Sequence, residues 1–472
     1  MLKKLSHRRG SPDDPACGRN DRKLCGMETD PDNQEDYEIN LEKVELPITE
    51  AHFPAPFAEG LEYSTPARGS WNIVHTGMMI PEAHQIFVCA RGCLRGVVLT
   101  AAEMDMMDRY SAIEIREENI MNGGIEDLML DGVADILKKL PRRPKAILLF
   151  INCQHFFLAY DQDYVYDTLK ERFSDIDFID CYMIPTLRKS GIGPDEKMRM
   201  QLYEMLKPQE KDEKQINIIG SNLRIDESCE IYGLVRDAGY RLLQIQDCRS
   251  YEEYQSMAKA ALNLYLEPIA GRSADRLEQR LGQQYLYLPF SFDYDRIDQN
   301  YKELSEWMGR EAPDLSGKRE EADRALEETL ALVGEMPLAV DYTFTFLILS
   351  FSKLLLERGF NLKVIYVDEF YPQEKEEFLW IREQHPEVII AACRRAERRV
   401  LPRWRGEEYL AVGQKAAYFT GADHFVNVVE GGGFMGYGGI IEIARLMREA
   451  YLEKKDRRAL IRKKGYGCLS LI

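Results

Sequence analysis

The 472-residue chain is long enough for several domains, and its 45% content of hydrophobic residues is sufficient for more than one core. Its 62 basic and 79 acidic residues give a formal net charge of −17, which argues against a broad nucleic-acid surface or binding to anionic membranes and suits a basic patch on a partner protein. Because no apolar run reaches the ~20 residues of a membrane helix and no apolar stretch follows the basic N-terminus, we expect a cytoplasmic protein.

Residues 1–45 are rich in charged residues, Asn and Pro and poor in apolar ones, a composition that predicts a disordered tail. Cys17 and Cys25 lie in this tail without a CxxC spacing or a neighbouring histidine. They are therefore only a weak indication of a metal site.

From about residue 60 onwards, short apolar runs alternate with amphipathic segments. The apolar runs predict strands at 146–153, 216–220, 240–245, 262–266, 285–289, 338–342, 361–367 and 387–393. The amphipathic segments predict helices at 126–137, 226–238, 250–260, 274–281, 321–334, 374–384 and 440–449, and one that ends near residue 358. Continuous apolar strands alternating with helices are typical of an α/β protein whose parallel sheets are covered on both faces.

The polar, turn-rich stretch 309–320 predicts a linker that divides this pattern. We expect three α/β domains separated as follows: a first domain at 46–212, a second at 213–308, a linker and helix at 309–335, and a third domain at 336–472.

Two cysteines four residues apart, Cys89 and Cys93, stand in the stretch HQIFVCARGCLRG. On one helical turn, or on a loop after the apolar run 86–88, their side chains would lie close together. Arg91 and Arg95 flank them, and cationic neighbours lower the pKa of a thiol, so one interpretation is a thiolate that binds iron or attacks a substrate. The CxxxC spacing alone is a weak motif, and a pair of ordinary thiols stays open.

Cys153 stands at the carboxyl end of the predicted strand 146–153, before a polar loop with His155, Tyr160, Asp161 and Asp163. Ligands of open parallel sheets bind outside the carboxyl ends of the strands, so Cys153 is a candidate site residue. A thiol that faces the core is the alternative.

Four further cysteines lie in or beside apolar segments: Cys181, Cys229, Cys248 and Cys393. We expect them to be buried structural thiols.

Two glycine-rich elements precede predicted helices. Gly123 and Gly124 predict a tight turn before the helix 126–137. The segment 429–439 has six glycines, which suit close approach to a ligand, a mobile lid, a helix N-terminus open to an anion, or a plain surface loop. The chain has no GxxxxGK[ST] motif, and we expect neither a P-loop nucleotide site nor a standard dinucleotide site.

The elements resemble, in order, those of the nitrogenase component 1 superfamily, which includes the dark-operative protochlorophyllide and chlorophyllide reductases and the scaffold that builds the nitrogenase cofactor. The matching elements are Gly92-Cys93 after a strand and short loop, Glu118–Gly124, Cys153 at a strand end, and the segment 434–445. The resemblance covers roughly residues 60–450 and is strongest to a nitrogenase-like branch of anaerobic bacteria.

The chain also departs from this family. The stretch 64–69 lacks the upstream Cys that holds the family's bridging cluster, and Cys89 is the thiol that could replace it. The Cys and the His that hold the catalytic cofactor of nitrogenases fall near Leu266–Glu267 and at Met435, where neither residue type is present. The resemblance therefore does not extend to nitrogen fixation.

The resemblance implies three Rossmann-like parallel-sheet domains around an inter-domain cleft, and a [4Fe-4S] cluster held by Cys89, Cys93 and Cys153. It implies a homodimer, or a heterodimer with a related component 1 subunit. It also implies that a separate ATP-hydrolysing, nitrogenase-reductase-like iron protein supplies the electrons, because the chain lacks a P-loop.

A small-molecule substrate, or a further cofactor such as a tetrapyrrole, would bind in the cleft, against the glycine-rich loop residues Gly431, Gly432, Gly433, Met435 and Tyr437. No general acid can be named, because we expect His84 and His155, near the cluster ligands, to be structural.

Two alternatives stay open. A scaffold or chaperone that assembles or carries a metal cofactor would share the cluster but perform no turnover. A cluster-free binding protein that keeps the α/β frame would leave Cys89, Cys93 and Cys153 far apart.

Overall fold

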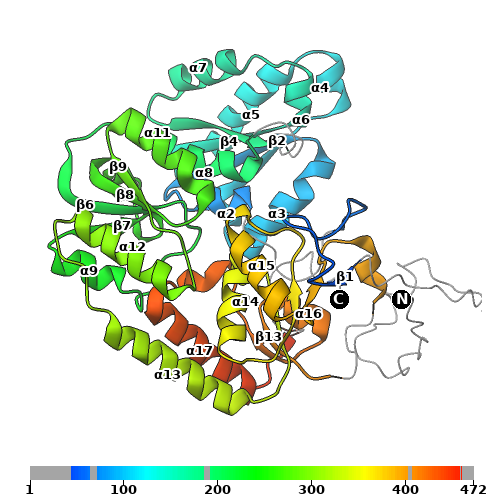
Figure 1. Cartoon of the computed structure of the whole chain (residues 1–472). Helices are drawn as coiled ribbons and strands as arrows, with labels where there is room; N and C mark the ends of the chain where they lie inside the picture. Colours follow the sequence, from blue (N-terminus) through cyan, green and yellow to red (C-terminus); the bar gives the residue numbers. More distant parts are fainter. Residues whose placement is uncertain (1–43, 64–71, 185–191, 402–406, 458, 460–472) are drawn as a thin grey trace, which may run out of the picture. The chain divides into compact units, whose positions relative to one another are not determined.

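The computed structural model describes residues 44–63, 72–184, 192–401, 407–457 and 459 (Figure 1). The chain forms two compact units. The central unit comprises residues 70–319 with 432–440, and the terminal unit comprises residues 320–431 and 441–472 with the N-terminal residues up to 69. Most of the predicted tail, with Cys17 and Cys25, and the stretch 64–69 lie outside the described residues.

The first sheet of the central unit has the order β3-β2-β4-β5, and all of its strands are parallel. The strands are β2 (Ala83–Cys89), β3 (Tyr110–Glu114), β4 (Ala146–Asn152) and β5 (Asp177–Met183). Every residue of β2 and β4 is buried. Successive side chains point to opposite faces of the sheet, so that Phe87 and Phe150 belong to one apolar cluster and Ile86 and Leu149 belong to a second. This two-sided burial accounts for the continuous apolar run of β4 in the sequence.

Helices cover both faces of this sheet. The cluster with Phe87 includes residues of α2 (Ile73–Met78), α3 (Leu94–Glu103) and α8 (Pro194–Glu204). The cluster with Ile86 includes residues of α5 (Ile125–Lys139) and α7 (Gln162–Arg172). Two short helices, α4 (Glu117–Met121) and α6 (Cys153–Phe157), precede α5 and α7.

The second sheet of the central unit has the order β7-β6-β8-β9 and is also parallel. Its strands are β6 (Asp212–Ile219), β7 (Arg241–Gln244), β8 (Ala260–Tyr265) and β9 (Gln284–Tyr287), and its helices are α9 (Ile231–Asp237), α10 (Tyr251–Gln255), α11 (Gly271–Leu281) and α12 (Tyr294–Trp307). Buried amides link neighbouring strands: Asn217 Nδ2 donates to Asn263 Oδ1, and Asn263 Nδ2 donates to Gln283 Oε1, each at 3.0 Å. Satisfied buried amides of this kind fix the strand register.

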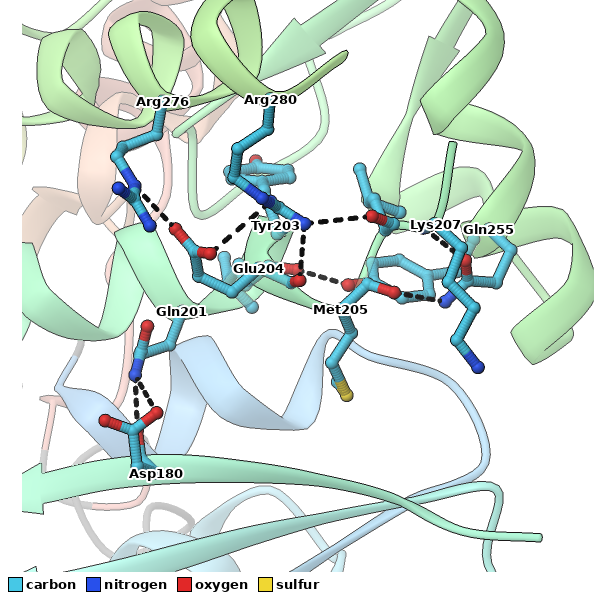
Figure 2. Close-up of polar contacts among 12 residues, drawn as sticks. Asp180, Gln201, Tyr203, Glu204, Met205, Lys207, Gln255, Arg276 and Arg280 are labelled. Carbon is cyan, nitrogen blue, oxygen red and sulfur yellow. Dashed lines mark hydrogen bonds and ion pairs between the residues drawn. The ribbon is translucent and has the colours of Figure 1, made fainter. Parts of the chain in front are cut away.

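Polar contacts between α8 and α11 join the two sheets of the central unit (Figure 2). The Arg280 guanidinium donates to the carbonyl oxygens of Tyr203, Glu204 and Leu206 at 2.7–3.0 Å, at the C-terminal end of α8. A charged donor at this position satisfies carbonyl oxygens at the end of the helix and also complements the helix dipole. Arg276 pairs with the Glu204 carboxylate at 2.9 Å beside it. The first two predicted domains thus share one compact unit.

The sheet of the terminal unit has the order β1-β12-β11-β10-β13-β14. Its strands are β1 (Glu45–Pro47), β10 (Leu338–Asp341), β11 (Leu362–Tyr366), β12 (Ile389–Ala391), β13 (Leu410–Val412) and β14 (His424–Val426). Its helices are α13 (Ser316–Val333), α14 (Ile348–Glu357), α15 (Lys375–Gln384), α16 (Gln414–Thr420) and α17 (Gly436–Leu452); α13 and α17 each begin in residues assigned to the central unit. The strand β1 pairs antiparallel with β12, so this sheet is mixed rather than parallel as expected.

The structure confirms the α/β fold class. The predicted strands and helices are present with shifted ends: β6 starts at Asp212, and the predicted helix 226–238 is reduced to α9. The exact domain boundaries remain predictions. Among the described residues, no helix is long and apolar enough to cross a membrane.

Candidate functional site

The candidate site lies at the carboxyl edge of the first sheet. From β2 the chain passes to β3 on one side, and it then returns to β4 on the other side of β2. The gap between β2 and β4 is therefore the topological switch point, where ligands of open α/β sheets bind. Cys89 is the last residue of β2, and Cys153 directly follows β4. Since Phe87 pairs with Phe150, the two cysteines end adjacent strands at nearly the same level.

Cys93 belongs to the short 3₁₀ turn Arg91–Cys93 that follows β2, and its side chain is exposed. Of the two arrangements open at the start, the loop is therefore correct and the shared helical turn is not. The loop is tied to α6, because the Ala90 N–H donates to Gln154 Oε1 at 3.1 Å. This bond joins the residue after Cys89 to the residue after Cys153.

Burial raises the pKa of the Cys89 thiol to about 12, and charge interactions with Cys93 and Cys153 contribute to the rise. The expected lowering by Arg91 and Arg95 is therefore wrong for Cys89, because burial is the largest cause of the shift and the charge interactions come from the two other thiols. The same interactions mean that Cys93 and Cys153 both lie within electrostatic reach of Cys89. Without a bound cation Cys89 holds its proton, and metal binding would have to release it.

Histidines near the sequence motif have structural roles. His155 is fully buried in α6, with Nδ1 in contact with the capping residue Asn152, and burial lowers its pKa to about 4. His84 lies at the other end of β2 from Cys89, where its Nε2 is 2.8 Å from Ser111 Oγ, and burial also lowers its pKa to about 4. Both imidazoles are thus neutral near pH 7, and neither is poised to supply a proton.

A test of the donor set separates a single ion from a cluster. Within the described residues, no three His, Cys, Asp or Glu side chains are grouped closely enough to hold one metal ion. The thiolates of an iron–sulfur cluster bind different iron atoms and stand farther apart than the ligands of one ion. Thiolates such as those of Cys89, Cys93 and Cys153 are the donor type that iron–sulfur clusters use.

The surface next to Cys153 is apolar. Phe156, Phe157 and Leu158 are exposed at the end of α6, and Tyr164 is exposed on α7. A Cβ atom added at Gly92 or at several nearby glycines would meet no neighbouring atom. Large apolar side chains that are exposed at consecutive positions are unusual on a monomer and are typical of a protein interface.

The predicted turn at Gly123 and Gly124 is confirmed, because Gly123 has a φ of +66° and Gly124 precedes α5. The predicted burial of the four other cysteines is also confirmed: Cys181, Cys229, Cys248 and Cys393 are all buried. A surface cavity of about 390 Å³, lined by residues including Arg241, Asp247 and Arg249, lies beside the edge strand β7.

The predicted cofactor-binding residues lie between β14 and the first turn of α17. Gly431, Gly432 and Gly433 all have positive φ angles, whereas the side chains of Met435 and Tyr437 are buried. The Tyr437 hydroxyl donates to Asp298 Oδ1 at 2.7 Å. Contact with a ligand by this segment remains a prediction.

The spacing of Gly431, Gly433 and Gly436 matches GxGxxG between a strand and a helix, which the sequence analysis overlooked. In a dinucleotide site the first turn of the helix is open to phosphate. Here Tyr301 Oη and Glu230 Oε2 fill that space, at 2.0 and 2.2 Å from a Cβ atom added at Gly436. A carboxylate in this place repels pyrophosphate, so the spacing does not make a dinucleotide site.

Sequence reasoning also missed a buried ionic group in the terminal unit. Asp341, at the end of β10, accepts hydrogen bonds from the backbone N–H groups of Thr343 and Ala416 at 2.8 and 2.7 Å. Lys415 is buried nearby, and burial lowers the pKa of its amine, while charge interactions with Cys393 and Asp341 oppose this lowering. Asp341 and Lys415 are 74 positions apart, so no local pattern could reveal the pair.

The sequence profile of a family described as nitrogenase component 1 type oxidoreductase matches residues 74–451. The fold is similar to two solved structures, "Nitrogenase Cp1 at pH 6.5" with a TM-score of 0.63 and "Nitrogenase Cp1 at pH 5" with a TM-score of 0.53. The first is 14% identical and the match covers 84% of this chain and 94% of that one; the second is 13% identical, with 89% and 96% covered. No curated protein matches the sequence. The chain therefore belongs to the nitrogenase component 1-type oxidoreductases.

Proposed function

We propose that the chain is an iron–sulfur redox subunit that takes electrons from a separate ATP-dependent reductase and reduces a small molecule, in the manner of the tetrapyrrole-reducing relatives. The observation that carries the proposal is the meeting of Cys89 and Cys153 at the switch point between β2 and β4, with Cys93 on the adjoining loop. Family membership supports iron–sulfur chemistry in general.

In this proposal Cys89, Cys93 and Cys153 hold a [4Fe-4S] cluster, which supplies one-electron transfer when bound. Three thiolates leave one coordination position for a group from a partner subunit, an oxygen ligand or the substrate. Cys89 would release its proton on binding, and its complete burial would keep water from one side of the cluster. The exposed Cys93 would form the side nearest to a partner.

The exposed side chains of Phe156, Phe157 and Leu158 support a partner at this same place. We propose that a second copy or a related component 1 subunit covers them. The electron donor is a further partner, a nitrogenase-reductase-like iron protein that hydrolyses ATP, because this chain has no P-loop of its own. The net charge of −17 suits a basic docking surface on that donor.

The substrate or further cofactor would be contacted by the segment that contains Gly431, Gly432, Gly433, Met435 and Tyr437. Nitrogen fixation is not part of the proposal. The positions that hold the nitrogenase cofactor in the resemblance are occupied by Leu266–Glu267 and Met435, which supply no Cys or His ligand.

The proposal is tested by electron transfer under anaerobic conditions. Purified chain is mixed with a nitrogenase-reductase-type iron protein, dithionite and MgATP, and the reduced cluster is followed by EPR. We expect a signal that requires ATP and that is absent in the Cys153→Ala variant but retained in Cys248→Ala, a matched buried cysteine of the same unit. A signal that persists in Cys153→Ala, or the lack of any signal in the wild type, contradicts the proposal.

A scaffold for metal-cofactor assembly is the second candidate, because the side chains of Met435 and Tyr437 are buried and so are not exposed to a substrate. It predicts a bound cluster with no ATP-dependent reduction. Transfer of a preassembled metal cofactor to an acceptor protein, measured by metal analysis of the separated proteins, would favour the scaffold.

A further inference from the structure

The helix α17 begins inside the glycine-rich segment, and its first N–H groups cannot bond within the helix. One of these donors, the Gly438 N–H, bonds to Glu230 Oε1 at 2.8 Å. Glu230 lies just before α9, 208 positions away in sequence. A carboxylate at a helix N-terminus satisfies a free donor and interacts favourably with the helix dipole.

The residue at the N-cap position of α17, Met435, has no side-chain oxygen that could supply this cap. A Cβ atom at Gly438 would stand 1.9 Å from the Ser228 carbonyl oxygen, and one at Gly439 would stand 2.6 Å from the Phe434 carbonyl carbon. The glycines thus permit a close approach of backbone to backbone. The capping oxygen therefore comes from another part of the chain, from Glu230.

The carboxylate of Glu230 is itself held in a fixed orientation. Its Oε2 accepts the Tyr301 hydroxyl at 2.7 Å, and Tyr301 is fully buried in α12. The same hydroxyl lies 3.7 Å from Cys229 Sγ. Each oxygen of Glu230 therefore has its own partner, and one side chain bridges α12 and α17.

Two further bonds fasten the segment on either side of Met435. The Asp226 N–H donates to the Gly433 carbonyl oxygen at 2.9 Å, and the Tyr437 hydroxyl donates to Asp298 Oδ1 at 2.7 Å. Met435 lies between these anchors and is buried. The segment is thus fixed at three points rather than free as a lid.

We propose that Glu230 is a positioning residue that caps α17 from outside the helix and thereby fixes the segment from Gly433 to Gly439, with Met435 and Tyr437. The hydrogen bonds that hold the segment do not involve a cluster. Only its relevance to a ligand rests on the proposed function.

The test is hydrogen–deuterium exchange of the full-length protein, read by mass spectrometry in peptides that cover residues 432–443. In Glu230→Ala we expect exchange at the first turn of α17 to be about 10-fold faster, while the peptide of β4 stays protected. Glu230→Gln keeps a carbonyl oxygen for Gly438 and an amide for the Tyr301 oxygen, so it should restore protection to within about 3-fold of the wild type. The control is Glu227→Ala, which removes an exposed carboxylate of the same loop that pairs with Arg224 at 3.4 Å.

Wild-type exchange in Glu230→Ala, or equally fast exchange in Glu230→Gln, overturns the proposal. If Glu230→Ala does not fold, Tyr301→Phe decides, because it removes the bond that orients the carboxylate and should speed exchange by about 3-fold. Unchanged exchange in Tyr301→Phe would then overturn it. Iron content is measured on the same samples, so that loss of the cluster and loss of the cap are separate results.

Discussion

The carboxyl edges of the first sheet of the central unit and of the sheet of the terminal unit, here called the third sheet, have the same topological position. The side chains at the two edges differ in their exposure. Both are switch points, one between β2 and β4 and the other between β10 and β13. At the first, Cys93 is exposed and Cys153 is partly exposed beside apolar surface. At the third, Asp341 and Lys415 are buried, and Asp341 is saturated with hydrogen bonds. A switch point is therefore a place where a site can form, and the local side chains decide whether it binds a ligand or closes on itself.

The buried Asp341 and Lys415 at the edge of the third sheet give the largest expected effect on the free energy of unfolding. Asp341→Ala removes the acceptor of the Ala416 N–H and leaves Lys415 buried without this carboxylate, so we expect a loss of about 3–5 kcal/mol in the free energy of unfolding. The measurement is urea unfolding followed by circular dichroism, with the exposed Glu383→Ala as control. Adding Lys415→Met to Asp341→Ala should recover part of the loss. A change below about 1 kcal/mol would mean that the edge is not closed by this pair.

A second buried carboxyl in the terminal unit predicts a pH dependence. Burial raises the pKa of Glu374 to about 8, although its Oε1 accepts the N–H groups of Leu349 and Ser350 at the start of α14. Because the folded chain holds this proton and the unfolded chain releases it near pH 4.5, stability should fall by roughly 2–4 kcal/mol as the pH rises from 5 to 8.

Glu374→Gln removes this titration. We expect the variant to lose that part of the pH dependence and to be more stable than the wild type at pH 8. If the free energy of unfolding of the variant depends on pH between 5 and 8 in the same way as that of the wild type, Glu374 does not titrate in this range.

The contact between the two sheets of the central unit predicts a smaller effect. Arg280→Ala leaves three carbonyl oxygens at the end of α8 without their charged donor, so we expect a loss of about 1.5–3 kcal/mol. Arg276→Ala removes a half-exposed ion pair on the same helix and should cost less than about 1 kcal/mol. Equal losses in the two variants, measured by urea unfolding, would argue that Arg280 acts only as another surface charge.

The exposed apolar side chains beside the edge of the first sheet predict the smallest effect on stability and a large effect on subunit association. Replacing Phe156 and Phe157 by Ser should change the free energy of unfolding by less than about 0.5 kcal/mol, because both side chains are exposed. It should also abolish the subunit association proposed at this surface, measured by sedimentation velocity. Leu452→Ser, another exposed apolar residue, is the control. An unchanged sedimentation profile would place the interface elsewhere.

The sequence predicted the parts that depend on local pattern. The apolar run of β4 ends at Asn152 within one residue of the expected end, and Gly123 has the positive φ of the expected turn. Strands of three residues such as β13 and β14 are too short to show periodicity, and β1 ends in a proline. The antiparallel pairing of β1 therefore had no signal in the sequence.

The parts that depend on long-range packing could not be predicted. The thiols were found because residue type and strand position both mark them, but the burial that raises the pKa of Cys89 is a property of the whole sheet. Glu230 and Tyr301 are 71 positions apart, and only the fold brings them to the first turn of α17. The glycines of that turn suggested a free loop, whereas the structure uses several of them for close packing.

The central claim is that Cys89, Cys93 and Cys153 hold a cluster, and the most direct test is the content of iron and acid-labile sulfide, with an EPR spectrum, of anaerobically purified protein. Wild type is compared with the Cys93→Ala, Cys153→Ala double variant, and Cys248→Ala is the control. We expect about four irons per chain or per dimer in the wild type and the control, and loss of iron in the double variant with folding retained. An iron-free wild type that folds as the double variant does would contradict the claim and leave a binding protein with the frame of this family.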